Sequence, residues 1–176
     1  LLVTENKMGV FGMGRMGKWE IPGGGQDKDD SGFCHTAVRE LVEEMGFDPD
    51  LYYPLLKFIK NNTISFALRY KAGTYVMYVA KIDVIDINKA SEMAKNRLDK
   101  FKKLDRKSKS CLKTLVELTN FTCMSLEEMD KTELRNRDYS FLRKPAILKR
   151  INAFCSDDNI PVFKKKLKFI DFSNIY

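Results

Sequence analysis

The chain has 176 residues, which is enough for one domain with an elaborated edge and too few for two. Its composition of 44% hydrophobic and 31% charged residues excludes a disordered chain, and only 10 Gly and 5 Pro exclude a fibrous one. No apolar run approaches the roughly 18 residues that a membrane span needs. We therefore expect residues 1–176 to form a single globular domain that does not enter a membrane.

The net charge of +7 is unevenly distributed. Residues 95–113 hold nine bases against two acids, whereas residues 20–50 hold nine acids against two bases. An acidic region beside a basic one is typical of a metal site next to a surface that attracts phosphate.

The N-terminal part is predicted to be extended and rich in glycine. Residues 1–3 read as the end of a strand, and because no Met precedes Leu1 we expect the start of the sequence to be cut. Glycines punctuate residues 9–17, which predicts a loop. Residues 19–21 predict a short strand that stops at Pro22, followed by a tight glycine turn over residues 23–25.

A helix is predicted from Ser31, which can cap its start, to Met45, with Gly46 as its C-terminal stop. On a helical wheel one stripe is apolar, and it consists of Cys34, Val38, Leu41, Val42 and Met45. Three glutamates fall on the opposite side, where the pattern predicts exposed carboxylates: Glu40, Glu43 and Glu44.

The middle of the chain is predicted to supply most of the sheet. Residues 51–60 and 64–71 are assigned to strands, and residues 74–82 have the strongest strand pattern of the chain. Aromatic residues alternate along these strands, so that one face could hold a nucleobase while the other packs into the core; they are Phe66, Tyr70, Tyr75 and Tyr78.

The C-terminal half is predicted to be mainly helical. A basic helix is expected over residues 88–113, a strand over residues 121–124, and a further helix from Pro145. Ser125 is expected to cap a short acidic turn after that strand. The combined pattern predicts an α/β (α+β) fold in which helices flank a central mixed sheet.

The four cysteines form no C-x-x-C pair, and the chain has only one histidine. A disulfide framework or a zinc site is therefore not expected. We interpret Cys34, Cys111, Cys123 and Cys155 as reduced core thiols of a cytosolic protein.

The three helical glutamates are the chemically informative feature. Like charges at spacings of three and four residues repel one another, and a helix built only for stability would mix signs there. The glycine turn brings bare backbone close to the same helix. Carboxylates and a backbone carbonyl are the ligands that a hard cation such as Mg²⁺ prefers.

These residues resemble a known family, the Nudix hydrolases. The match runs over a 23-residue box with the family pattern G-x5-E-x7-R-E-U-x-E-E-x-G-U, and all fixed positions but that of Ser31 agree with it. The box begins at Gly25 and ends with Arg39, Glu40, Leu41, Val42, Glu43, Glu44, Met45, Gly46 and Phe47. Residues 19–24 resemble the family's lead-in, and residues 121–129 more weakly resemble its later strand and acidic turn. The resemblance implies a Nudix-type fold with a loop–helix–loop motif, a missing first strand, and a basic helical insertion over residues 88–116.

The single departure is Ser31, which stands where the family has Glu. In this position the Glu is expected to brace the loop against the helix. Asp30 can replace it only if the loop carries one extra residue, because eight residues separate Asp30 from Arg39.

The resemblance also implies roles for residues in and near the box. Glu40, Glu43, Glu44 and the carbonyl of Gly24 would hold Mg²⁺ or Mn²⁺, and Arg39 would orient the carboxylates. Glu117 is our candidate for the general base, with Glu40 as the alternative.

The implied activity is metal-dependent hydrolysis of a nucleoside diphosphate linked to another moiety. Two alternatives follow from the basic residues 95–113 and the lysines at 164–166: cleavage of the 5′ cap of an RNA, or cleavage of a diphosphoinositol polyphosphate. An alternative of another class is a non-catalytic module that binds nucleotide or RNA, and Ser31 is the feature that favours it.

Overall fold

The computed structural model describes residues 1–4, 6–71, 73–104 and 116–170. A mixed sheet of six strands has the order β3-β2-β1-β5-β4, with β6 paired to β2. The pairing of β1 with β5 is parallel, and the other pairings are antiparallel. The strands are β1 (Leu2–Thr4), β2 (Met8–Met13), β3 (Trp19–Glu20), β4 (Thr63–Tyr70), β5 (Gly73–Ile82) and β6 (Phe121–Ser125).

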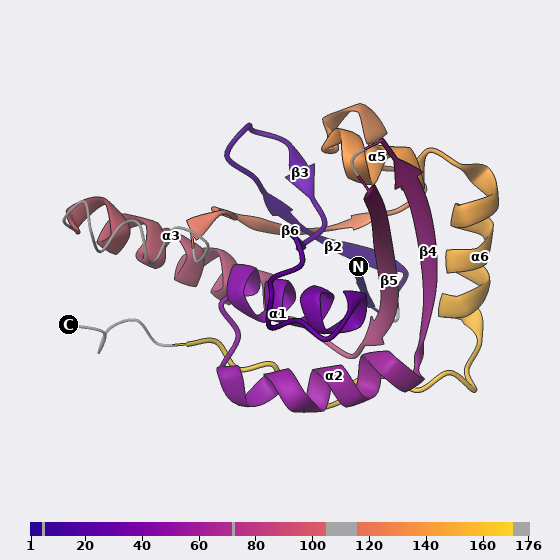
Figure 1. The fold of residues 1–176 in the computed structure, drawn as a ribbon, viewed down its shortest axis with the longest axis horizontal. Coiled ribbons are helices and arrows are strands. Elements are labelled where there is room, and N and C mark those ends of the chain that lie inside the picture. Colours follow the sequence, from indigo (N-terminus) through magenta and orange to yellow (C-terminus); the bar gives the residue numbers. More distant parts are fainter. Residues whose placement is uncertain (5, 72, 105–115, 171–176) are drawn as a thin grey trace.

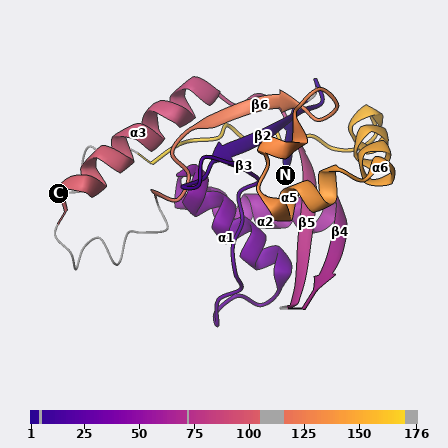
Figure 2. The same ribbon diagram turned by 90° about the horizontal axis from the view of Figure 1, so that it is seen from above.

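Helices cover both faces of this sheet (Figures 1 and 2). They are α1 (Phe33–Met45), α2 (Tyr52–Asn61), α3 (Ile87–Lys103), α5 (Asn136–Leu142) and α6 (Pro145–Ser156), with short 3-10 turns at Pro49–Leu51 and Lys131–Glu133. One core packs α1, α2 and the start of α3 against one face of the sheet. A second core packs α5 and α6 against the other. The predicted α+β arrangement of a mixed sheet between helices is confirmed.

Neighbouring residues of β1 and β2 divide between these two cores. Leu2 and Val10 belong to the core with α1, whereas Val3 and Phe11 belong to the core with α5 and α6. Successive side chains of a strand point to opposite faces, so strands buried on both faces carry consecutive apolar residues. This burial makes β1 and β2 the centre of the fold.

The prediction of a loop over residues 9–17 was wrong for its first half, because β2 runs through Met13. The glycines there serve close packing. A Cβ on Gly12 would lie 2.4 Å from the Leu118 side chain, and one on Gly9 would lie 2.7 Å from that of Leu126. Glycine in this strand therefore marks close approach of neighbours rather than a turn.

The prediction of a strand over residues 51–60 was also wrong, since α2 occupies this segment. Its buried residues Leu55, Leu56 and Ile59 recur at helical spacing. Asp48 helps to start the preceding 3-10 turn by accepting a hydrogen bond from the Asp50 N–H. The strand predictions for residues 64–71, 74–82 and 121–124 are confirmed by β4, β5 and β6.

Helix α1 ends as predicted but starts later. Gly46 adopts the left-handed conformation with φ 67°, and its N–H bonds to the carbonyl oxygens of the last turn. The N-cap is Gly32 rather than Ser31, with φ 145°, a conformation that favours glycine. Ser31 is exposed in the preceding loop and makes no cap.

The remaining predictions concern the C-terminal half. The basic helix is confirmed as α3 through Lys103, the helix from Pro145 is confirmed as α6, and Ser125 accepts a hydrogen bond from the Glu128 N–H at 3.4 Å. Predictions for residues 105–115, which include Cys111, lie outside the described residues. The other three cysteines are free thiols. None of the helices in the described ranges combines the length and hydropathy that crossing a membrane requires.

Candidate active site

Two of the three box glutamates are buried, contrary to the prediction of an exposed acidic face. Glu40 is 8% exposed and Glu44 is 5% exposed, whereas Glu43 is partly exposed. The face of α1 opposite its apolar stripe is covered by the glycine turn that follows β3. A helical wheel cannot reveal this, because the covering chain comes from another part of the fold.

The glycine turn lies directly on these two carboxylates. The Gly23 N–H donates a hydrogen bond to Glu44 Oε2 at 2.7 Å. A Cβ on Gly24 would fall 2.4 Å from Glu40 Oε1, so a side chain there would displace the carboxylate. The turn therefore brings together three of the predicted ligand residues, Gly24, Glu40 and Glu44.

Arg39 is the centre of a charged network at the edge of this site. Its Nε and Nη2 donate to the two carboxylate oxygens of Asp30, at 3.2 and 2.9 Å. Nη1 lies 3.0 Å from Glu40 Oε1 and 3.3 Å from Glu43 Oε2. Nη2 also donates to the Gly25 carbonyl at 2.9 Å. Arg39 thus joins the loop, the turn and two of the glutamates.

Asp30, and not the exposed Ser31, makes the contact between the loop and Arg39. Its carboxylate is 6% exposed and also accepts a hydrogen bond from the Asp27 N–H at 2.9 Å. The hydrogen bonds from Arg39 lower the pKa of Asp30 to about 2. Among the alternatives for this loop, the geometry supports the one in which Asp30 replaces the missing Glu.

Burial dominates the electrostatics of the carboxylates. Removal from water raises the pKa of Glu44 to about 8, with further raising by the charges of Glu40 and Glu20. Burial also raises the pKa of Glu40 and Glu43, although Arg39 opposes it in both. Buried groups of like charge are destabilising without a counter-charge.

The glycine turn is also held by α5, a helix that the sequence pattern did not predict. Arg137 donates to the carbonyl oxygens of Gly23 and Ile21, each at 3.0 Å, and its guanidinium lies 4.6 Å from the centre of the Tyr75 ring. The fully buried Asp138 accepts the Ile21 N–H at 2.9 Å. The sequence offered no signal for these roles, because a short polar segment normally reads as a solvated surface.

A second buried arginine holds the end of α1. Arg97 on α3 is 3% exposed and donates to the carbonyl oxygens of Glu43 and Glu44, at 3.4 and 3.2 Å. A Cβ on Gly46 would lie 2.1 Å from its Nη1. Arg97 belongs to the basic stretch that the sequence predicts to attract phosphate, but it is buried and instead supports the end of α1.

Glu117, the candidate general base, lies in the segment before β6. It is close enough to Glu40 for its negative charge to raise the pKa of Glu40. Glu20 of β3 acts on Glu44 in the same way. Besides α1 itself, two separate segments of the chain therefore place acidic residues around the buried carboxylates.

The oxygen donors of the site are of the kind that a divalent cation such as Mg²⁺ binds. The site offers carboxylate oxygens next to bare glycine backbone, and a cation would offset the like charges of Glu40 and Glu44. Within the described part of the chain, no three acidic, histidine or cysteine side chains converge as a ready-made metal cage. Instead, Arg39 pairs with Glu40 and Glu43, and the Gly23 N–H holds Glu44.

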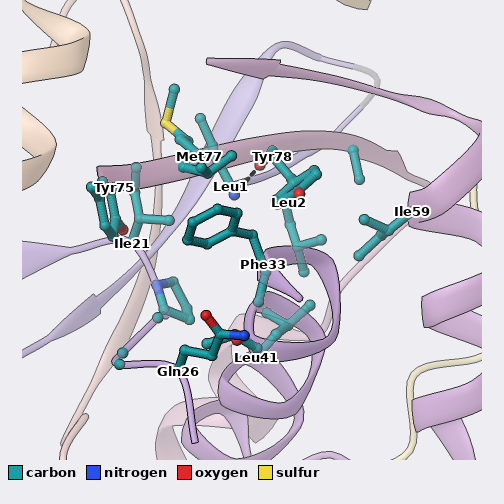
Figure 3. Close-up of a pocket in the computed structure, with 18 of the residues that line it drawn as sticks. Leu1, Leu2, Ile21, Gln26, Phe33, Leu41, Ile59, Tyr75, Met77 and Tyr78 are labelled. Carbon is teal, nitrogen blue, oxygen red and sulfur yellow. Dashed lines mark hydrogen bonds between the residues drawn. The ribbon is translucent and has the colours of Figure 1, made fainter. Parts of the chain in front are cut away.

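An apolar cavity of about 390 Å³ opens beside the glycine turn (Figure 3). Phe33 of α1 reaches into it, with Tyr75 and Met77 of β5 on the facing wall and Ile21 next to them. The residues that line it include no charged side chain. We call this space the apolar cavity.

Comparison with known proteins assigns the chain to a family. The sequence model of the NUDIX domain matches residues 1–109, which include β1 to β5, the glycine turn and helix α1. Comparisons with curated proteins and with solved structures gave no match. The family match covers more than half of the chain and contains the buried carboxylates and Arg39 described above. The chain therefore belongs to the Nudix family, and its domain indicates a hydrolase that acts on pyrophosphate bonds.

Proposed function

We propose that this protein is a metal-dependent hydrolase that cleaves the pyrophosphate of a nucleoside diphosphate linked to another moiety. The observation that carries the proposal is the burial of Glu40 and Glu44 against Gly23 and Gly24, beside an Arg39 that Asp30 anchors. Removing Glu40 and Glu44 from water penalises their charged forms and raises the pKa of both groups, and a bound cation would offset that penalty, so the arrangement is understandable as a site for a cation.

The donors for the cation would be the carbonyl of Gly24 and the carboxylates of Glu40, Glu43 and Glu44. Bound there, Mg²⁺ or Mn²⁺ would neutralise charge on the pyrophosphate and acidify the attacking water. Arg39 would keep Glu40 and Glu43 oriented through its contacts at 3.0 and 3.3 Å.

The reaction needs a group that accepts a proton. Water attacks one phosphorus, the bond to the bridging oxygen breaks, and a carboxylate takes the proton that the water loses. We assign this role to Glu117, because its charge acts on Glu40 and no described contact ties it to Arg39. Glu40 is the alternative.

The apolar cavity supports a nucleoside rather than an inositol as the bound moiety. A nucleobase buries flat apolar surface, and Phe33 and Tyr75 provide aromatic faces within the cavity. A polyphosphorylated inositol would need cationic side chains around it, and the side chains lining this cavity are uncharged.

The decisive test is a hydrolysis panel with Mg²⁺ or Mn²⁺ and an EDTA control. The panel contains a nucleoside diphosphate sugar, a nucleoside triphosphate, a capped RNA and a diphosphoinositol polyphosphate. Glu43→Gln and Glu44→Gln should each reduce turnover at least about tenfold, which is about 1.4 kcal/mol in the barrier. Glu128→Gln, an exposed acid in the turn after β6, is the matched control and should keep the wild-type rate.

Three results would contradict parts of this proposal. Activity that survives EDTA would contradict the metal requirement. Wild-type rates in both glutamine variants would contradict the assignment of Glu43 and Glu44 as metal ligands. Nucleotide binding without product from any substrate would leave the non-catalytic module as the function.

A further inference from the structure

We propose that the face formed by the tip of the β4–β5 hairpin and by α5 and α6 binds a single-stranded polynucleotide. The inference goes beyond the proposed function, because it concerns binding away from the carboxylates and needs no turnover. The face carries five exposed bases, four of them beyond residue 109, where the family match ends: Lys71, Arg143, Lys144, Lys149 and Arg150. We call it the basic surface.

Acidic side chains are missing from the segments that build the basic surface. Residues 63–82 and 139–156 contain no Asp or Glu. None of the five bases forms an ion pair within the described residues. Glu127 accepts a hydrogen bond from Asn152, which lies on the flank of α6 opposite Arg150, because residues two apart on a helix are about 200° apart. The described residues therefore leave the positive charge of this face uncompensated, which favours an anionic partner.

A groove of about 400 Å³ lies between the tip of the β4–β5 hairpin and α5. Its lining includes Tyr70, Thr74 and Tyr75 from the hairpin, and Asn136, Arg137 and Ser140 from α5. Tyr75 also lines the apolar cavity, and Arg137 holds the glycine turn. Arg143, the C-cap of α5, continues the helix face that carries Asn136 and Ser140. The groove therefore runs beside the basic surface and begins next to the candidate active site.

The basic surface presents flat groups as well as charge. Tyr70 is 43% exposed at the groove. The guanidinium of Arg150 lies 4.9 Å from the centre of the Phe66 ring, and that of Arg143 lies 5.5 Å from the centre of the Tyr139 ring. Nucleobases stack on aromatic rings and on guanidinium planes, and cationic side chains contact the phosphates between them. The combination fits a chain in which flat bases alternate with phosphates.

Other anionic or self-associating partners fit this face less well. A protein that lies on a membrane inserts several apolar side chains into it. Among the large apolar side chains that are exposed in the described residues, Tyr70 is the one that belongs to the segments of the basic surface. A second copy of the chain would bring two faces of the same charge together, in a protein whose net charge is already +7.

Helix α3 is the competing location for a polyanion. It projects at the opposite end of the protein from α6, which lies along β4 (Figures 1 and 2). Lys103 is exposed there, but Lys102 Nζ lies 3.2 Å from Asp99 Oδ1 and Arg97 is buried against the end of α1. Because the two locations are far apart, substitutions in each can be tested separately.

The test measures binding of a fluorescein-labelled oligouridylate of about 12 nucleotides by fluorescence anisotropy in EDTA, so that binding is separated from metal-dependent turnover. Arg143→Gln/Arg150→Gln should raise the Kd at least about tenfold, and the slope of log affinity against log salt should become shallower by about 0.7 for each lost phosphate contact. Lys57→Gln/Arg69→Gln is the matched control and should keep the wild-type Kd. It removes the same charge from exposed positions on α2 and on the other face of β4, since Arg69 pairs with Thr74 and alternates with Leu68.

Two further variants separate charge from stacking. Lys144→Gln/Lys149→Gln changes exposed lysines whose side chains make no described contact, so it should fold normally, and it should weaken binding and make the salt slope shallower in the same way. Tyr70→Ser should weaken binding at least about fivefold with an unchanged salt slope, because it removes a stacking surface but no charge. The thermal midpoint of every variant is measured to verify folding.

A second arm identifies the partner. An oligothymidylate, an RNA duplex and vesicles containing phosphatidylserine are titrated into the same proteins. Weaker binding of both oligonucleotides to the two charge variants supports the proposal, and weaker binding of the oligouridylate alone supports it with a contact to the 2′-hydroxyl groups. An unchanged Kd in Tyr70→Ser, or tighter binding of the duplex than of the single strands, overturns the single-stranded partner. Vesicle binding that the charge variants lose, without oligonucleotide binding, assigns the face to a membrane and overturns the proposal.

Three results with the oligouridylate alone also overturn it. They are no binding by the wild-type protein at low salt, an unchanged Kd in both charge variants, and an equal loss in the matched control or in Lys102→Gln/Lys103→Gln on α3. The proposed function fails separately, because it is tested by hydrolysis. If the protein hydrolyses none of the substrates but binds the oligouridylate through the basic surface, the proposed function is wrong and the basic surface remains.

Discussion

Replacing Asp30 by Asn tests whether this residue, rather than position 31, braces the loop that precedes α1. Asp30 receives a two-point contact from Arg39 at 3.2 and 2.9 Å, and the same guanidinium reaches Glu40 and Glu43 through Nη1. An amide at position 30 loses the negative charge and turns an NH₂ group towards the donors of Arg39. We expect both lower stability and a poorer fit of the carboxylates to a cation.

The magnitude follows from the pKa and from the geometry. Lowering the pKa of Asp30 from 3.8 to about 2 corresponds to at most about 2.4 kcal/mol of stability. Arg39 is 20% exposed, so solvent screens part of this, and we expect a loss of about 1–2 kcal/mol. For a chain of this length that loss lowers the thermal midpoint by about 2–4 °C per kcal/mol.

The effect should depend on pH in one direction. Because the folded-state pKa of Asp30 lies below the unfolded value, its contribution is present above about pH 3.8 and is lost as the pH falls towards 2. The assay is urea unfolding of wild type and Asp30→Asn at pH 7 and pH 3 in EDTA. The difference should be full at pH 7 and smaller at pH 3.

Ser31→Glu supplies the comparison. Position 31 is exposed, so this change should alter stability by less than about 0.5 kcal/mol and leave the Mg²⁺ requirement unchanged. Asp30→Asn should raise the Mg²⁺ concentration for half-maximal rate. Wild-type stability in Asp30→Asn, or a lower Mg²⁺ requirement in Ser31→Glu, would refute the assignment of the brace to Asp30.

Three further predictions concern buried and acidic groups. Burial raises the pKa of Glu44 from 4.5 to about 8, so the metal-free protein should lose stability as the pH rises across that interval. In urea unfolding at pH 8 in EDTA, Glu44→Gln should therefore be about 1–3 kcal/mol more stable than wild type. Equal stability of the two proteins would contradict this prediction. Arg97→Met should lower the free energy of unfolding by about 2–3 kcal/mol, because it removes the donors to both carbonyl oxygens at the end of α1. Arg97→Lys keeps one donor group and should lower the free energy of unfolding by less. An unchanged thermal midpoint in Arg97→Met would refute this support. Glu117→Gln should lower kcat at least about tenfold with little change in KM, whereas an unchanged kcat would move the role of base to Glu40.

The prediction for Glu44 corrects an expectation that the sequence favours. A carboxylate opposite the apolar stripe of a helix is expected to be exposed, and its neutralisation should then leave metal-free stability unchanged. In the structure Glu44 is 5% exposed beneath Gly23, so neutralising it removes a desolvation cost. Activity and metal-free stability are therefore expected to change in opposite directions in this variant.

The local sequence was sufficient to identify the box and to predict the body of α1 and the strands β4 and β5. The periodic apolar stripe and the left-handed stop at Gly46 are properties of short segments, and the structure confirms them. The same local rules were wrong where long-range packing decides. Glycines in β2 predicted a loop because the sequence does not show that Leu118 and Leu126 crowd that strand.

Tertiary structure alone decided which charged groups form the candidate site. Glu40 and Glu44 are buried because the turn after β3 covers them, and Arg97 is a support because α3 crosses the end of α1. Arg137 reaches Gly23 from a position 114 residues away in sequence. Sequence spacing determines which residues share a helix face, since that depends on the local backbone. Whether a charge on that face is exposed, paired or buried depends on the distant segment packed over it, which no local pattern encodes.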